Sequence, residues 1–101
     1  MLAGCASPLA DSPEANAELK RLVQEHANKG YDHWRRAMAA QQDIHVEVTG
    51  PSGQRYQVDV DPVWDDEPNG VIRVIVCIDD FGSSAYRPLC DGALLSSSEA
   101  R

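Results

Sequence analysis

The 101-residue sequence lacks any hydrophobic run close to the ~20 residues that a membrane-spanning helix requires, so we expect no membrane span. Basic side chains are also few: 9 Lys and Arg stand against 16 Asp and Glu, which gives a net charge of −7. Because such a field repels phosphate backbones, we expect no nucleic-acid ligand. Hydrophobic residues at 43% and charged residues at 25% are ordinary for a globular domain and argue against disorder.

Recognised catalytic and metal-binding spacings are absent as well. The three histidines form neither an H-x-H nor an H-E-x-x-H pattern, and the loop at 50–53 lacks the lysine of a phosphate-binding loop. The acidic groups at 65–67 and 79–80 flank a predicted strand, which places them roughly 25 Å apart at ~3.3 Å per residue. The sequence therefore predicts no catalytic residue, no metal site and no cofactor.

Cysteine use bears on the compartment of the protein. Cys5, Cys77 and Cys90 make an odd number without C-x-x-C spacing, which matches neither a disulfide framework nor a zinc site. We therefore expect reduced thiols and a cytoplasmic protein. The alternative for Cys77 and Cys90 is a disulfide, because both fall on neighbouring predicted strands. The alternative for localisation is a lipoprotein, if the lipobox-like Leu-Ala-Gly-Cys at residues 2–5 is the remnant of a truncated export signal.

The negative charge is concentrated in the second part of the chain. Residues 1–42 hold five acidic and five basic side chains, whereas residues 43–101 hold eleven acidic side chains and only four arginines. A surface of this kind suits a basic protein as partner, and the alternative is that the acidity serves solubility alone.

Two helices are predicted in the first part of the chain. Ser12 can cap the first helix, Pro13 suits its first turn, and Gly30 is placed to end it in a left-handed conformation. Asp32 can cap a second helix that runs to about Gln41. Both segments carry a stripe of residues at helical spacing. The two stripes are Ala15, Leu19, Leu22, Val23 and His26, then Trp34, Ala37, Met38 and Gln41.

From residue 44 the apolar period changes from helical to two, which predicts β-strands. Strands at 44–49 and 56–61 flank a Gly-Pro-Ser-Gly loop, which suits a three-residue hairpin with Gly53 in a left-handed conformation. The matching register places apolar residues on one face. The predicted pairs are Val48 with Tyr56, Val46 with Val58 and Ile44 with Val60.

Two further strands complete an antiparallel meander. Pro62 is predicted to end the second strand or to sit at a bulge near its end, and a turn at 64–70 leads into a third strand at 71–79. Turn residues at 80–84 precede a fourth strand at 85–90. The predicted pairs between the second and third strands are Val58 with Val76 and Val60 with Val74, together with a surface ion pair between Asp61 and Arg73.

These elements predict one α+β domain, in which two N-terminal helices pack on one face of a four-stranded antiparallel β-meander. The domain is expected to span residues 12–90. Residues 1–11 are expected to form a flexible lead, and residues 91–101 a loose tail.

The third strand is apolar on both faces, which points to a contact surface. The face of a meander that lies away from its helices normally carries polar residues, so Ile75 and Cys77 on that side suggest a cover, either the chain's own tail or a second copy. Trp64, beside an acidic turn, can anchor a partner or can instead cap the end of the sheet against the second helix. The predicted interaction surface consists of Trp64, Asp65, Asp66, Arg73, Ile75, Cys77, Tyr86 and Arg87.

The leading hypothesis is a non-enzymatic binding or interaction module, whose partner is a second copy in a homodimer or a basic protein. The competing hypothesis is a small-ligand-binding protein or minor enzyme with a pocket between helices and sheet. That candidate pocket would be lined by His26, Trp34 and Tyr56.

Several short runs resemble a family of small uncharacterised bacterial proteins. The runs are V-T-G-P-S-G at 48–53, Y-Q-V at 56–58, W-D-D-E-P at 64–68 with Gly70, I-R-V at 72–74 and I-D-D at 78–80. The resemblance covers roughly residues 44–90 and implies a bacterial origin. Because no activity is attached to that family, the resemblance transfers no catalytic residue.

Overall fold

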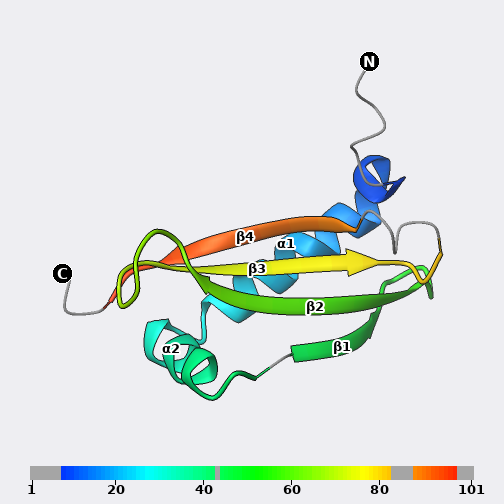
Figure 1. Ribbon diagram of the computed structural model, residues 1–101. Helices are drawn as coiled ribbons and strands as arrows, with labels where there is room; N and C mark the ends of the chain where they lie inside the picture. The colour runs from blue at the N-terminus through cyan, green and yellow to red at the C-terminus, as the bar shows by residue number, and fades with distance from the viewer. Residues whose placement is uncertain (1–7, 43, 83–87, 98–101) are drawn as a thin grey trace.

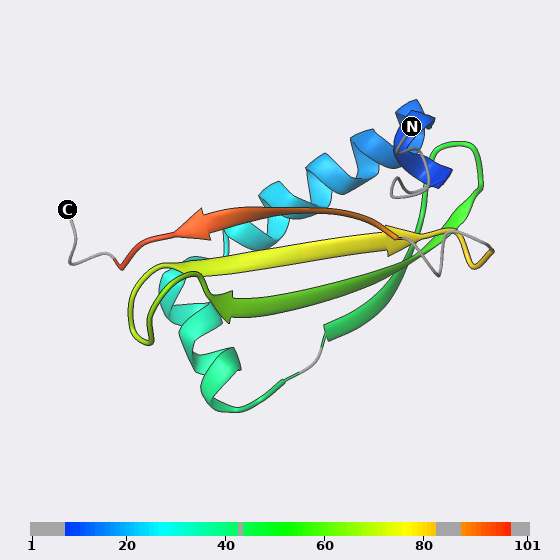
Figure 2. The same cartoon turned by 45° about the horizontal axis from the view of Figure 1, so that its top comes forward.

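Two helices pack against a four-stranded antiparallel sheet (Figures 1 and 2). The structure is a computed structural model, and it describes residues 8–42, 44–82 and 88–97. Strand order is β1-β2-β3-β4 with antiparallel neighbours throughout, so the predicted α+β meander is confirmed. The elements are the 3-10 helix η2 (Pro8–Asp11), α1 (Pro13–Ala27), α2 (Tyr31–Ala39), β1 (Ile44–Thr49), β2 (Arg55–Trp64), β3 (Ile72–Asp79) and β4 (Leu89–Leu95).

The core lies between the helices and one face of the sheet. Helix α1 packs on β3 and β4, and α2 packs on β2 and β3. Trp34 is fully buried at the centre of this layer, where its indole N–H donates to the His26 carbonyl at 2.7 Å. The remaining core side chains are Leu9, Ala15, Leu19, Leu22, Ala37, Tyr56, Val58, Val60, Ile72, Val74, Val76 and Ile78.

Helix α1 begins where the sequence predicts. Ser12 Oγ accepts a hydrogen bond from the Ala15 N–H at 3.1 Å, and Pro13 occupies the first turn, where a missing N–H is not needed. The predicted flexible lead is wrong from Pro8 onward, because η2 carries Leu9 into the core. Residues 1–7 lie outside the described residues.

The joint between the helices differs from the prediction. Gly30 has a positive φ of 90°, but its ψ of 163° is not left-handed helical, and it caps the start of α2 instead of ending α1. Asp32 therefore lies inside the first turn of α2 and is not its cap. The reason is conformational: a positive φ next to the helix start suits glycine, and the chain begins α2 as soon as that residue has turned it.

The first hairpin follows the predicted register. Val48 lies opposite Tyr56, Val46 opposite Val58 and Ile44 opposite Val60. Gly53 has φ 92°, and the Gly50 N–H donates to the Gln54 carbonyl at 2.8 Å to close the turn.

The predicted pairing of β2 with β3 is wrong by two residues. Val58 lies opposite Ile78 and Val60 opposite Val76, so the same faces are kept but every partner changes. The predicted Asp61–Arg73 ion pair is also wrong, because Arg73 Nε donates to Asp65 Oδ1 at 2.9 Å. The slip arises because β2 continues through Pro62 to Trp64 and shortens the turn that follows.

Pro62 can continue the strand because its missing N–H is not needed. The Asp65 N–H donates to the Val71 carbonyl at 2.8 Å, which directs the backbone groups of Asp65 toward β3. The backbone N–H and C=O groups of successive residues point to opposite sides of a strand. The backbone groups of Pro62 and Trp64 therefore point toward the β1 side. There β1 has already ended, at the pair Ile44–Val60. Pro62 thus occupies an edge position, where proline is tolerated.

The fourth strand lies later in the chain than predicted. It spans Leu89–Leu95, so residues 91–95 of the predicted loose tail belong to the sheet. Leu89, Ala93 and Leu95 turn partly buried side chains toward the core at a period of two. Asp91-Gly92 has the composition of a turn and hid this period. Most of the predicted strand at 85–90 lies outside the described residues.

A disulfide joins Cys77 to Cys90, so the expectation of reduced thiols at these two positions is wrong. The two residues lie directly opposite each other on β3 and β4, with Cα atoms 4.0 Å apart. This is the close spacing of a non-hydrogen-bonded pair, in which the two side chains leave the sheet side by side. The bridge lies on the sheet face that points away from the helices.

Candidate functional site

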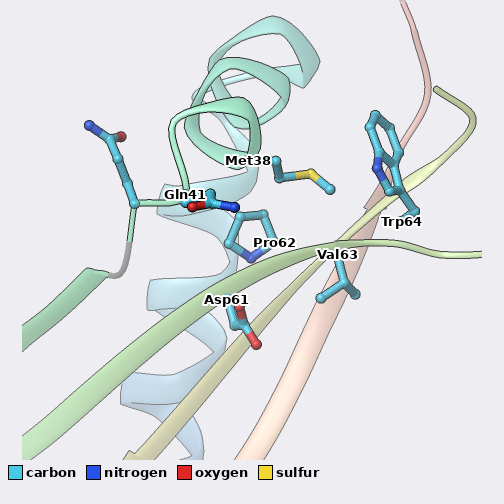
Figure 3. A pocket seen from close by; sticks show the side chains of 7 residues that line it. Met38, Gln41, Asp61, Pro62, Val63 and Trp64 are labelled. Carbon is cyan, nitrogen blue, oxygen red and sulfur yellow. The ribbon is translucent and has the colours of Figure 1, made fainter. Parts of the chain in front are cut away.

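A groove of about 610 Å³ lies at one end of the sheet, between β2 and the C-terminal end of α2. Strand β2 supplies four consecutive residues, 61–64, and the helix end supplies Met38, Gln41 and Gln42. Figure 3 shows Pro62 and Trp64 on the side of β2 nearer to α2, whereas Asp61 and Val63 point to the other side. The groove therefore opens onto the edge of β2 and reaches both of its faces.

The groove exists because β1 is shorter than β2. Strand β1 pairs with residues 55–60, whereas β3 pairs with residues 57–64. The last four residues of β2 consequently have a neighbour on one side only. Gln41, with φ 56°, turns the chain at the end of α2, so Gln41 and Gln42 form part of the opposite wall.

Asp61 supplies the negative charge of the groove. It makes no ion pair with any described residue, and none of the residues that line the groove is basic. Its neighbour two residues earlier differs: Asp59 Oδ1 lies 2.6 Å from His45 Nδ1. The hydrogen bond that His45 donates to the Asp59 carboxylate raises the pKa of His45.

Trp64 supplies apolar surface at the other end of the groove. The residue is half-buried, and Met38 projects from α2 toward it (Figure 3). Among residues 8–42, 44–82 and 88–97, no hydrogen-bond partner is found for the Trp64 indole N–H or for the side chains of Gln41 and Gln42. These polar groups can therefore bind a ligand without losing a bond inside the protein.

The predicted interaction surface is divided by the structure. Only Trp64 lines the groove. Asp65 pairs with Arg73, and Ile75 and Cys77 are half-buried on the sheet face away from the helices. Asp66 is exposed in the loop after β2, whereas Tyr86 and Arg87 lie outside the described residues.

The three residues of the predicted inner pocket are part of the core. His26, Trp34 and Tyr56 are 5%, 0% and 2% exposed. His26 Nδ1 lies 2.8 Å from the Leu22 carbonyl. Their own side chains occupy the space between helices and sheet.

Tyr56 belongs to a polar cluster at the other end of β2. Glu14 accepts hydrogen bonds from the Tyr56 hydroxyl (2.7 Å), the Ser52 N–H (2.7 Å) and the Ser52 hydroxyl (2.9 Å). These bonds lower the pKa of Glu14, and the bond from Tyr56 is the largest cause. Burial, and then Glu14, raises the pKa of Tyr56 to about 12. A side chain at position 50 would force the Glu14 carboxylate to shift, because a Cβ on Gly50 would lie 2.7 Å from the Glu14 carboxyl carbon.

Sequence reasoning missed most of the groove. It did not select Met38, Gln41 or Gln42 as binding residues, and it placed Asp61 in an ion pair. The available signal was Pro62, because proline inside an alternating strand marks an edge.

Within the described residues, no three His, Cys, Asp or Glu side chains form a group that could hold a metal ion. The same residues include no helix whose length and hydrophobicity would let it cross a membrane. Searches against protein-family models, curated proteins and solved structures found no match. The resemblance to a family of small bacterial proteins stays a prediction.

Proposed function

We propose that this domain is a non-enzymatic binding module for a basic protein, and that the groove beside Asp61 receives part of that partner. The observation that carries the proposal is Asp61 itself, a carboxylate without an ion-pair partner among the described residues in a groove that has no basic lining. A lysine or arginine of the partner would supply the missing charge. Met38 and Trp64 would contact a neighbouring apolar side chain.

The charge balance of the sheet supports a basic partner. Arg55 pairs with Glu47 and Arg73 pairs with Asp65. No other basic residue except His45 occurs in the described part of the sheet half, residues 44–82 and 88–97. Asp66 and Glu67 follow Trp64 in the chain and add negative charge at the same end of the sheet.

A synthetic octapeptide of alternating lysine and valine is a direct probe of this proposal. Fluorescence anisotropy should show binding that weakens as salt rises from about 50 to about 300 mM, because salt screens charge pairs. An octapeptide of alternating glutamate and valine should not bind.

The variant Asp61→Asn should weaken binding of the lysine–valine peptide about tenfold, since it removes one partner of a charge pair. Asp66→Asn is the matched control, because it makes the same charge change at an exposed site outside the groove, and it should weaken binding less than about twofold. Equal losses in the two variants would mean that the peptide senses net charge alone, which would overturn the proposal.

A second copy of the chain is the second candidate partner. Leu94 is 56% exposed on the sheet face away from the helices. Beside it a hollow of about 280 Å³ is lined by residues including Ile75 and Gly92. A two-fold axis between Leu94 and Gly92 would insert the leucine of each copy into the hollow of the other. Sedimentation should then show a dimer that Leu94→Lys disrupts, and a monomer at high concentration would contradict this.

We also propose that the domain works in an oxidising compartment. Disulfides persist where thiols are not kept reduced, and the Cys77–Cys90 bridge supports such a location, in line with the export alternative. When the chain is produced with an export signal and then denatured, alkylation should label one of the three cysteines, because the other two are bridged. Labelling of all three would count against the proposal.

A further inference from the structure

We infer that the groove holds its partner as an added β-strand: an extended segment pairs with the edge of β2 over residues 61–64. This inference rests on the proposed function and specifies how the basic partner is held. The starting observation is the unequal pairing of β2, whose last four residues pair with β3 but have no partner in β1.

Backbone direction along β2 follows from both of its ends. At the hairpin the Gly50 N–H donates to the Gln54 carbonyl, so Tyr56, Val58 and Val60 direct their backbone groups toward β1. At the far end the Asp65 N–H donates to the Val71 carbonyl, so the backbone groups of Asp65 point toward β3. The two bonds agree on the same alternation.

The groups that face the open edge are therefore defined. Pro62 presents its carbonyl, and Trp64 presents its N–H and its carbonyl. An extended segment could accept one hydrogen bond and donate two across this edge. Main-chain bonds of this kind provide the affinity when a peptide is added to a sheet.

The groove provides the room for such a strand. One wall is formed by residues 61–64 themselves, and the opposite wall by Met38, Gln41 and Gln42. Its volume of about 610 Å³ is within the range of sites that enclose small ligands. The amide side chains of Gln41 and Gln42 can pair with the outer edge of the added segment, because amides both donate and accept.

Side-chain alternation then defines the class of ligand. A residue placed opposite Asp61 would leave the sheet on the same face as Asp61, where a basic side chain is favoured. The adjacent residue, opposite Pro62, would point toward Met38, where an apolar side chain is favoured. We therefore expect a short extended segment with a lysine or arginine next to an apolar residue.

The edge of β4 is less suited to the same role. The close Cα spacing of Cys77 and Cys90 implies that Gly92, two residues later, directs its backbone groups away from β3. The carboxylate of Asp91 accepts that Gly92 N–H at 2.8 Å. This edge therefore has one N–H already bonded and carries an acidic side chain, both of which disfavour strand addition.

Amide hydrogen exchange, measured by NMR with the lysine–valine octapeptide as probe, tests the inference. The backbone amide of Trp64 should exchange at least about tenfold more slowly in the complex, because this N–H becomes hydrogen-bonded to the added strand. Val63 is the matched internal control: its N–H already faces β3, so its exchange should change much less.

Peptides with N-methyl groups sharpen the test. Methylation of the amides on one edge should weaken binding about tenfold, and methylation of the other edge should not, because only one edge would face β2. Binding that depends on Asp61 but leaves Trp64 exchange unchanged would overturn strand addition and leave the proposed function standing. Absence of binding would overturn both.

Discussion

Tyr56 and Trp64 are aromatic residues on the helix-facing side of β2, yet their surroundings are opposite. Tyr56 is buried and its hydroxyl is bonded to Glu14. Trp64 is half-buried and its indole N–H has no partner among the described residues. The same strand thus has a saturated end, where α1 meets the first hairpin, and an unsaturated end, where β1 is missing.

The comparison teaches that strand length decides which end of this sheet can bind. At the saturated end β1 and β2 are in register up to the turn, and Glu14 satisfies the Ser52 N–H of that turn. At the unsaturated end the sheet lacks one strand over four residues. Polar groups left without a partner at such a place are available to a ligand.

The largest contrast should appear on truncation of the two aromatic side chains. Tyr56→Ala removes a buried ring and should lower the free energy of unfolding by about 3 to 5 kcal/mol. Trp64→Ala should cost clearly less, because that side chain is already partly in water. Urea denaturation of both variants measures the difference, and equal losses would contradict the comparison.

Removal of the polar group alone should give a smaller contrast. Tyr56→Phe deletes a hydrogen bond to a charged partner and should lower the free energy of unfolding by about 1.5 to 3 kcal/mol. Trp64→Phe is the matched variant, because it deletes an N–H without a partner among the described residues. If Trp64→Phe lowered the free energy of unfolding as much as Tyr56→Phe does, the indole N–H would contribute to stability and the comparison would fail.

Acid should act on the saturated end. The pKa of Glu14 is lowered in the folded protein, so its contribution to stability is present above the ordinary carboxyl value of 4.5 and is lost as pH falls through the folded value. Glu14→Gln should remove this loss, so that the free energy of unfolding depends less on pH below 4.5. Tyr56→Phe should shift it to higher pH, because the largest cause of the lowering is gone. Denaturation between about pH 2 and pH 6 tests both variants.

The smallest effect should come from His45, which lies beside the unsaturated end. Its pKa is raised by Asp59, so its contribution to stability is present below 6.5 and is lost as pH rises through the folded value. The loss of the imidazolium charge leaves Asp59 unneutralised next to Asp61. Binding of the lysine–valine peptide should then tighten by less than about threefold. His45→Asn should bind without this pH dependence.

Local patterns predicted the saturated end well. The cap at Ser12, the hairpin and its register each follow from neighbouring residues, and apolar period and turn chemistry agree there. The pairing of β2 with β3 could not be predicted in the same way. A shift of two residues keeps every side chain on its face, so periodicity cannot distinguish the two registers.

The groove could not be predicted because it depends on a difference between strand lengths. Trp64 was selected for its type and for the acidic turn beside it. The pattern predicts an ion pair between Asp61 and Arg73, but the true register places Asp61 opposite Ile75, and Arg73 pairs with Asp65. For a related reason the sequence leaves the Cys77–Cys90 bridge as an alternative only: the bridge requires the exact position of β4, which the turn-like residues 91 and 92 obscure.

The packing of α1 on β3 and β4 has a consequence for synthesis of the chain. Helix α1 is made early, but the strands that cover its apolar stripe are the last two to be made. At a synthesis rate of about 5 to 20 residues per second, that stripe stays uncovered for several seconds before β3 and β4 have been made. The first hairpin can form on its own in microseconds, but the helix layer cannot close until residue 95 has been made. Folding of this domain is therefore completed only at its final strand.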